Sequence, residues 1–139
     1  MDQGKYEEAK KTFGQSLAIK QAIGDRAGEA ATFYQLGFLA LKGGSRDIGL
    51  RLIAICCTIE KSIEHGDTRK DFETLATLAS QSGYGEKDLY LLMNDAWDAY
   101  QKDQGKGLIE AMSVENEASS TKGPLSRFFG LFSGGNRKK

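Results

Sequence analysis

The sequence predicts an all-α fold, a right-handed solenoid of antiparallel helical hairpins followed by a flexible tail, and three observations lead to it. A single proline in 139 residues leaves few obstacles to long helices. Apolar residues recur at spacings of three and four over most of residues 5–104. A pair of helices also recurs along the chain, and stacked pairs joined by short loops form a solenoid.

The helix pair repeats at two related offsets. An offset of 40 residues places Gly4–Ala9 on Gly44–Gly49. An offset of 42 residues places Gly24-Asp25 on Gly66-Asp67, and the extra residues are Glu64-His65 in the second turn. The chain therefore contains a recurring unit of about 40 residues, the length expected for a helical hairpin and its turns.

Glycine and acidic residues mark where the helices end and begin. Gly24 can take the left-handed conformation that closes a helix, and Asp25 offers a carboxylate to the free N–H groups that open the next one. About five helices are expected, over residues 5–23 and 27–41, from Ser45 or Asp47 to just before Gly66, and over residues 68–81 and 86–104. Their expected inner faces, in chain order, are Tyr6, Ala9, Phe13 and Leu17; Ala30, Phe33, Gly37 and Ala40; Ile48, Leu52, Cys56, Ile59 and Ile63; Phe72, Leu75 and Leu78; and Leu89, Met93, Trp97 and Tyr100.

The second expected helix carries two adjacent apolar stripes, so it needs neighbours on more than one side. Its second stripe consists of Tyr34, Phe38 and Leu41. Gly37 lies inside this helix and lowers helix propensity by about 1 kcal/mol relative to Ala. The expected gain is a close approach by another helix.

Charge and hydropathy disfavour two classes of function. The 19 basic and 19 acidic residues cancel, so no net charge steers the chain toward nucleic acid. No apolar run reaches the length of a membrane span, and the charged N-terminal residues do not resemble a signal peptide. A reducing, cytoplasmic location is therefore expected.

The residues that can carry chemistry form no recognised catalytic or metal-binding motif. Cys56 and Cys57 are adjacent in an apolar helical run, where neighbouring side chains point about 100° apart, so we interpret them as small buried hydrophobes. No CxxC pair exists and His65 is the only histidine, so no disulfide framework, metal site or cofactor is expected. We interpret His65 as an exposed residue at a helix C-terminus. The sequence does not predict an enzyme.

Two segments carry a resemblance to a known family. GKYEEAKKTFGQSLAI, residues 4–19, resembles the second helix of a tetratricopeptide repeat, and FYQLGFLA, residues 33–40, resembles the first helix of the next repeat. The phrase GDRAGEAATFYQLG and the long period are most similar to bacterial variants like the repeats of kinesin light chain. The resemblance extends through about Ile63. Beyond it the chain departs from the pattern, so the last two expected helices are interpreted as a divergent capping pair.

The resemblance implies a concave groove that binds a peptide or protein segment. Tyr34 and Phe38 would stack on the ligand, and Lys42 would meet a carboxylate. The alternative is that both aromatic side chains pack against the fourth helix. The groove residues implied by the resemblance are Ala31, Tyr34, Phe38, Leu41, Lys42, Glu73 and Tyr84.

The resemblance also implies that the chain begins within a repeat, because Met1 precedes a second helix that lacks its partner. Solenoid units need about three repeats or caps for stability. Upstream repeats of a longer array, or a second copy of the chain, would then cover the edge of the first helix.

Residues 113–139 are expected to form a flexible linker and a basic, aromatic tail, separate from a helical domain over residues 1–112. After Pro124 an apolar stripe at helical spacing consists of Leu125, Phe128, Phe129 and Phe132. Such a stripe beside basic residues fits an anionic membrane surface, a partner's groove or the concave face of its own solenoid. A disordered end is the fourth interpretation.

These observations together predict a non-catalytic scaffold that binds a protein or peptide. The alternative from another class is a regulatory or membrane-surface subunit that acts through residues 124–139. Salt dependence separates the two, because screening weakens the binding of a basic tail to anionic lipid and hardly affects an apolar groove contact.

Overall fold

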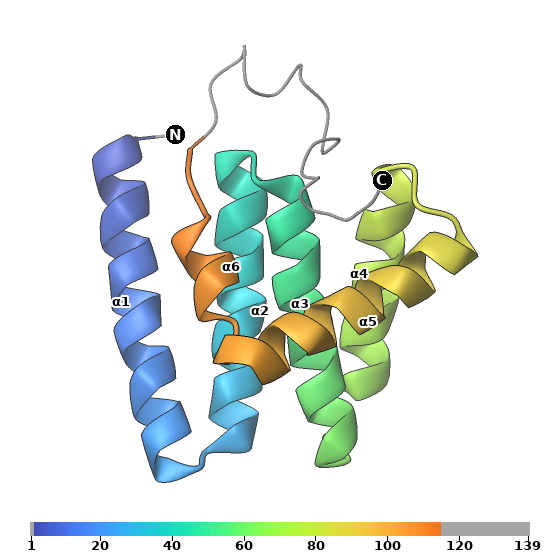
Figure 1. Ribbon diagram of the computed structural model, residues 1–139, viewed down its shortest axis with the longest axis horizontal. Helices are drawn as coiled ribbons and strands as arrows, with labels where there is room; N and C mark the ends of the chain where they lie inside the picture. Colours follow the sequence, from blue (N-terminus) through green and yellow to red (C-terminus); the bar gives the residue numbers. More distant parts are fainter. Residues whose placement is uncertain (1, 115–139) are drawn as a thin grey trace.

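The computed structural model describes residues 2–114 of the chain (Figure 1). These residues form helices and no strand, as the all-α prediction requires. The helices are α1 (Gln3–Ile23), α2 (Arg26–Gly43), α3 (Arg46–Ser62), α4 (Thr68–Gln81), α5 (Glu86–Asp103) and α6 (Lys106–Glu110). None of these six helices combines the length and the apolar character that a membrane crossing requires.

Helices α1 to α4 stand side by side, each antiparallel to the one before it (Figure 1). The helix α5 runs obliquely across this row, and the short α6 follows it. The centre of the molecule is α3, which contacts α2, α4, α5 and α6. Most of its side chains from Leu50 to Ile59 are therefore buried.

Glycine residues allow α2 and α3 to pack closely, as the sequence predicts for Gly37. A Cβ atom at Gly37 would lie 2.5 Å from Ile53 Cγ1 and 3.0 Å from the backbone oxygen of Gly49. A Cβ at Gly49 would lie 2.8 Å from the backbone oxygen of Gly37. Larger residues at either position would push the two helices apart.

The prediction that Ile63 and Phe72 lie in the core is wrong. Ile63 is 37% exposed, because α3 ends at Ser62 and the side chain lies beyond its last turn. Phe72 is 39% exposed, because α4 turns Asp71, Leu75 and Ala79 toward the core and leaves Phe72 beside that stripe. The other predicted inner-face residues of α1 to α4 are buried or packed against the core.

The structure departs from the prediction at α5 and α6. The helix α5 crosses α3 and does not form an antiparallel hairpin with α4, and α6 is an additional helix. The most buried side chains of α5 are Leu92, Ala96 and Tyr100, whereas the predicted stripe is only partly buried except for Tyr100. The Tyr100 ring meets the Phe33 ring of α2 edge to face, with ring centroids 5.8 Å apart.

The chain after α6 is hydrogen-bonded to α1 and to the turn between α2 and α3. Lys10 of α1 donates a hydrogen bond from Nζ to the backbone oxygen of Met112 at 2.9 Å. Ser45 Oγ donates to the backbone oxygen of Ser113 at 2.9 Å and accepts from its N–H at 3.3 Å. The predicted tail residues Leu125, Phe128, Phe129 and Phe132 lie outside the described residues.

Candidate functional site

The second half of α3, the turn that follows it and the first turn of α4 bring together side chains with metal- or proton-binding atoms. Cys56 and Glu60 are four residues apart and so share one face of α3. Asp71 is buried on the first turn of α4, which packs against α3. The chain between the helices turns at Glu64, whose φ of 55° is in the left-handed region. We call Cys56, Glu60, His65, Asp67 and Asp71 the junction cluster.

Glu60 belongs to two triads within the junction cluster. The possible ligand atoms of Cys56, Glu60 and Asp71, the inner triad, all lie within 4.8 Å of one another. The same limit holds for Glu60, His65 and Asp67, the outer triad. Glu60 Oε2 is 3.8 Å from His65 Nδ1, which accepts a hydrogen bond from the Asp67 backbone N–H at 3.0 Å. The inner triad is buried, whereas the His65 side chain is 34% exposed and opens the cluster to solvent.

Burial raises the pKa of two side chains of the inner triad, Glu60 and Cys56. It raises the pKa of Glu60 to about 7, and the neighbouring Asp71 carboxylate adds to that shift. Burial also raises the pKa of the Cys56 thiol well above its usual range, and the charge of Glu60 acts in the same direction. Glu60 Oε1 is buried and has no hydrogen-bond partner among residues 2–114. The inner triad thus places three acidic side chains together in the protein interior, one of them with an unsatisfied oxygen.

Two residues of the predicted groove form an aromatic pair, Tyr34 and Phe38 on α2. Their ring centroids are 4.9 Å apart, and Phe38 is 37% exposed. Burial raises the pKa of Tyr34, a side-chain hydrogen bond with Thr74 opposes that shift, and the Asp71 carboxylate adds to it. Tyr34 therefore has a contact with α4, as the packing alternative predicts, while Phe38 presents part of its ring to solvent.

Of the other predicted groove residues, Ala31, Leu41 and Lys42 lie on α2 within one helical turn of the aromatic pair. Leu41 is half-buried. Its side chain packs toward α3, because a Cβ atom at Gly49 would lie 2.9 Å from Leu41 Cδ2. Glu73 is exposed and its Oε2 lies 3.5 Å from Arg69 Nε on the same helix. Ala31 and Lys42 are exposed on α2.

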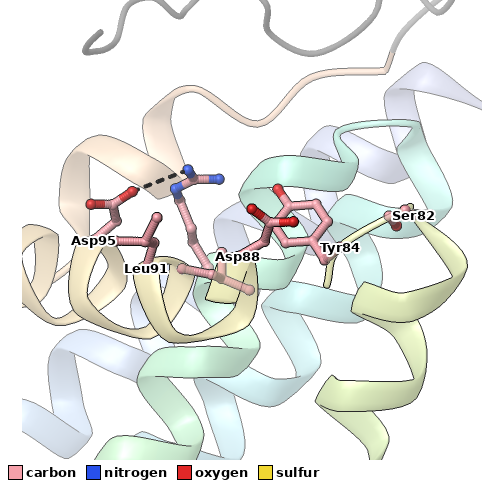
Figure 2. Close-up of a pocket in the computed structure, with 8 residues that line it drawn as sticks. Ser82, Tyr84, Asp88, Leu91 and Asp95 are labelled. Carbon is pink, nitrogen blue, oxygen red and sulfur yellow. Dashed lines mark ion pairs between the residues drawn. The ribbon is translucent and has the colours of Figure 1, made fainter. Parts of the chain in front are cut away.

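Tyr84 lies in a separate hollow between α3, the α4–α5 turn and α5 (Figure 2). Its hydroxyl donates to Asp47 Oδ1 at 3.0 Å, near the start of α3. Asp47 and Cys56 are nine residues apart, about 14 Å at the rise of an α-helix, so Tyr84 is distant from the junction cluster.

The hollow has a volume of about 360 Å³ and is lined by Arg51, Ser82, Gly83, Tyr84, Asp88, Leu91, Leu92 and Asp95. Its charged groups already have partners. Arg51 Nη2 lies 3.6 Å from Asp95 Oδ2, the pair joined by the dashed line in Figure 2, and Asp88 Oδ2 accepts from the Gly85 N–H at 2.8 Å. A ligand in this hollow would compete with these contacts.

An apolar patch lies on α1 at its C-terminal end. Ile19 is 60% exposed and Ile23 is 71% exposed, and both lie one turn apart on the same face. Ala18 and Ala22 are exposed beside them. We call these four residues the α1 edge. Its position is the one at which the sequence predicts contact with upstream repeats or a second copy.

Sequence reasoning found the aromatic pair and missed the junction cluster. Cys56 is buried and free, as predicted, but carboxylate oxygens of Glu60 and Asp71 lie within 4.8 Å of its sulfur. The spacing of Cys56 and Glu60 by four residues was a readable signal. The position of Asp71 depends on how α4 packs on α3, which no local pattern specifies.

Comparison of the chain with protein-family models, curated proteins and solved structures finds no match. The functional interpretation therefore depends on the geometry of these sites.

Proposed function

We propose that the chain is a non-catalytic scaffold that binds a protein or peptide segment on a solenoid of the tetratricopeptide type. The observation that supports this function best is the aromatic pair on α2. Phe38 is 37% exposed at the boundary of a well-filled core, with the Tyr34 ring 4.9 Å away. Partly exposed aromatic side chains supported from beneath are common anchors in protein interfaces.

The residues around the pair define the chemistry of its partner. Lys42 is exposed one helical turn beyond Phe38, so both lie on the same side of α2. A segment with an apolar side chain about 5–6 Å from a carboxylate would contact both residues. The two buried, free cysteines support the further proposal of a reducing, cytoplasmic location.

The α1 edge supplies a second surface for assembly. Ile19 and Ile23 are both more than half exposed and would be covered by a helix laid along α1. Under the proposed solenoid, this helix belongs to an upstream repeat or to another copy of the chain.

Selection of peptides from a random displayed library against the immobilised chain tests the scaffold function. Peptides that bind at the aromatic pair are expected to lose at least about tenfold affinity for Phe38→Ser, because a buried aromatic anchor typically contributes more than about 1.4 kcal/mol. The matched control is Tyr90→Ser, which removes an exposed aromatic ring from α5.

Circular dichroism of both variants separates lost binding from lost folding. Equal binding of the selected peptides to the Phe38→Ser and Tyr90→Ser variants would contradict the proposed surface. Loss of helicity in Phe38→Ser would show that this ring is a core residue.

A further inference from the structure

The strongest unexplained feature of the molecule is the Glu60 carboxylate. Glu60 is 5% exposed, and its Oε1 has no hydrogen-bond partner within residues 2–114. No lysine or arginine of the described residues lies within 4.0 Å of Glu60 or Asp71, and the nearest nitrogen base to Glu60 is the His65 imidazole, whose Nδ1 is 3.8 Å from Oε2. Buried carboxylates are normally paired, hydrogen-bonded or bound to a cation.

We propose that the inner triad, Cys56, Glu60 and Asp71, binds a divalent transition-metal ion of the Zn²⁺ class, with one coordination position open toward the outer triad. A thiolate and two carboxylates supply one soft and two hard donors, and histidine stands next to them in the outer triad. Zn²⁺ accepts sulfur, nitrogen and oxygen ligands in one site. Ca²⁺ and Mg²⁺ prefer oxygen ligands alone, so the sulfur of Cys56 disfavours them.

The distances within the inner triad fit this ion after a small contraction. Ligand atoms in a tetrahedral zinc site are about 3.3–3.6 Å apart, given metal–ligand distances of about 2.0–2.3 Å. The corresponding atoms of Cys56, Glu60 and Asp71 lie within 4.8 Å. Rotation of the two carboxylates is sufficient to close a difference of about 1 Å, because their terminal torsions are soft.

Two ligands of the proposed site are held by the central helix α3, and the third is supplied by α4 after a turn. Cys56 and Glu60 are on successive turns of the central helix α3, so their spacing is held by the helix itself. Asp71 is on the first turn of α4, after the turn that contains Glu64 at positive φ. His65 and Asp67 lie at the solvent side of Glu60, where an ion would enter.

A proton shared by Glu60 and Asp71 is the competing way to satisfy the Glu60 oxygen. It would place a proton between the two carboxyl groups, while the Cys56 thiol keeps its hydrogen bond to Glu60. A bound metal ion would replace the protons on the thiol and carboxyl groups, and its two positive charges would offset two of the three negative charges of the triad. The two occupants differ in a direct measurement, because only the metal ion binds sulfur.

The test uses the untagged full chain, stripped with a chelator and titrated with Zn²⁺ alone in competition with a chromophoric chelator. One Zn²⁺ per chain is expected, together with a rise in the midpoint of thermal unfolding. Substitution with Co²⁺ alone is expected to give a sulfur-to-cobalt charge-transfer band, which reports directly on the thiolate ligand.

Two variants and one matched control assign the site. Cys56→Ser should abolish the charge-transfer band, and both Cys56→Ser and Glu60→Gln should weaken Zn²⁺ binding by at least about 100-fold, more than the loss of a ligand's own hydrogen-bond partner usually costs. Cys57→Ser, which removes the adjacent buried thiol outside both triads, should retain the band and the affinity.

Three outcomes would overturn the proposal. They are no stoichiometric Zn²⁺ binding by the stripped chain, binding that survives both Cys56→Ser and Glu60→Gln, and binding lost in His65→Ala but retained in Cys56→Ser. Glu60→Gln keeps the shape of the side chain and removes a buried charge, so it is expected to fold and to give a result even if Cys56→Ser does not fold.

Discussion

The α1–α2 joint and the α3–α4 joint occupy equivalent places in the repeat, and each buries a carboxylate on the first turn of its second helix. These are Glu29 and, at an offset of 42 residues, Asp71. Glu29 accepts hydrogen bonds from the Tyr100 hydroxyl at 2.6 Å and from Gln21 Nε2 at 3.1 Å. Asp71 faces a second carboxylate, Glu60. The buried carboxylate of the first joint therefore has hydrogen-bond donors, whereas that of the second joint has another acidic side chain as its neighbour.

The two joints also differ in the backbone conformation of their turns and in the hydrogen bonds of their Asp residues. Gly24 has a φ of 74°, and Asp25 Oδ1 accepts from the Gly28 N–H at 2.8 Å, so both residues act as the sequence predicts. In the second joint Glu64 takes the left-handed conformation, and Asp67 makes no capping hydrogen bond. Gly24-Asp25 thus closes one helix and caps the next, whereas Gly66-Asp67 does neither and leaves the Asp67 carboxylate beside Glu60 and His65.

The largest expected difference between the joints follows from replacing their buried glutamates. Glu29→Gln should lower the free energy of unfolding by about 3 kcal/mol, because Gln places an amide donor where Gln21 and Arg26 already donate or pair. Glu60→Gln in the metal-free chain should be neutral or stabilising, since it removes a buried ionisable carboxyl group that has no lysine or arginine within 4.0 Å. Urea unfolding followed by circular dichroism measures both values. A loss at Glu60 as large as that at Glu29 would contradict the contrast.

A smaller effect is expected at alkaline pH. Burial raises the pKa of Tyr100 to about 12, and its hydrogen bond to Glu29 adds to the shift. The folded protein therefore keeps this proton while the unfolded chain loses it near pH 10, so stability should fall by about 2 kcal/mol between pH 10 and 12. Below pH 10 the contribution is fully present.

Tyr100→Phe should flatten this alkaline loss relative to the wild-type chain, measured as the free energy of unfolding in urea at each pH. Tyr90→Phe is the control, because it removes an exposed phenol from the same helix. An unchanged slope in the Tyr100→Phe variant would show that the interaction with Glu29 does not set the pH dependence.

The smallest expected difference concerns the turn glycines. Gly24→Ala should destabilise the chain by about 1 kcal/mol, because a Cβ is strained at a φ of 74°. Gly66→Ala should be neutral or stabilising by up to about 1 kcal/mol, because Gly66 is outside the left-handed region and a Cβ there would meet no atom within 4 Å. Thermal unfolding of the two variants measures both changes in stability. An equal loss of stability in the two variants would contradict the difference in backbone conformation between Gly24 and Gly66.

The sequence was sufficient to predict the helices and the first joint because these depend on local chemistry. The burial of Tyr6, Leu17 and Leu52 follows from helical periodicity. The path of α5 could not be predicted, since its two apolar stripes have similar spacing. Only packing on α3 selects the stripe that contains Leu92 and Ala96.

Of the two candidate sites, the aromatic pair could be predicted from local sequence spacing and the junction cluster could not. Phe38 and Tyr34 were predicted to be close because they are one helical turn apart. The junction cluster was not predicted, because Asp71 meets Glu60 through the packing of α4 on α3. Sequence spacing could suggest the pair on α3 but not its third member.

The hydrogen bonds of Lys10 set an order of events during synthesis. Its Nζ donates to the backbone oxygens of Glu110 and Met112, which are 100 and 102 positions later in the chain. At a translation rate of about 5–20 residues per second, the lysine emerges about 5–20 s before these partners exist. The helix α1 therefore obtains all of its contacts only after residue 112 has been made, and a nascent chain halted before residue 110 would carry α1 without these two hydrogen bonds.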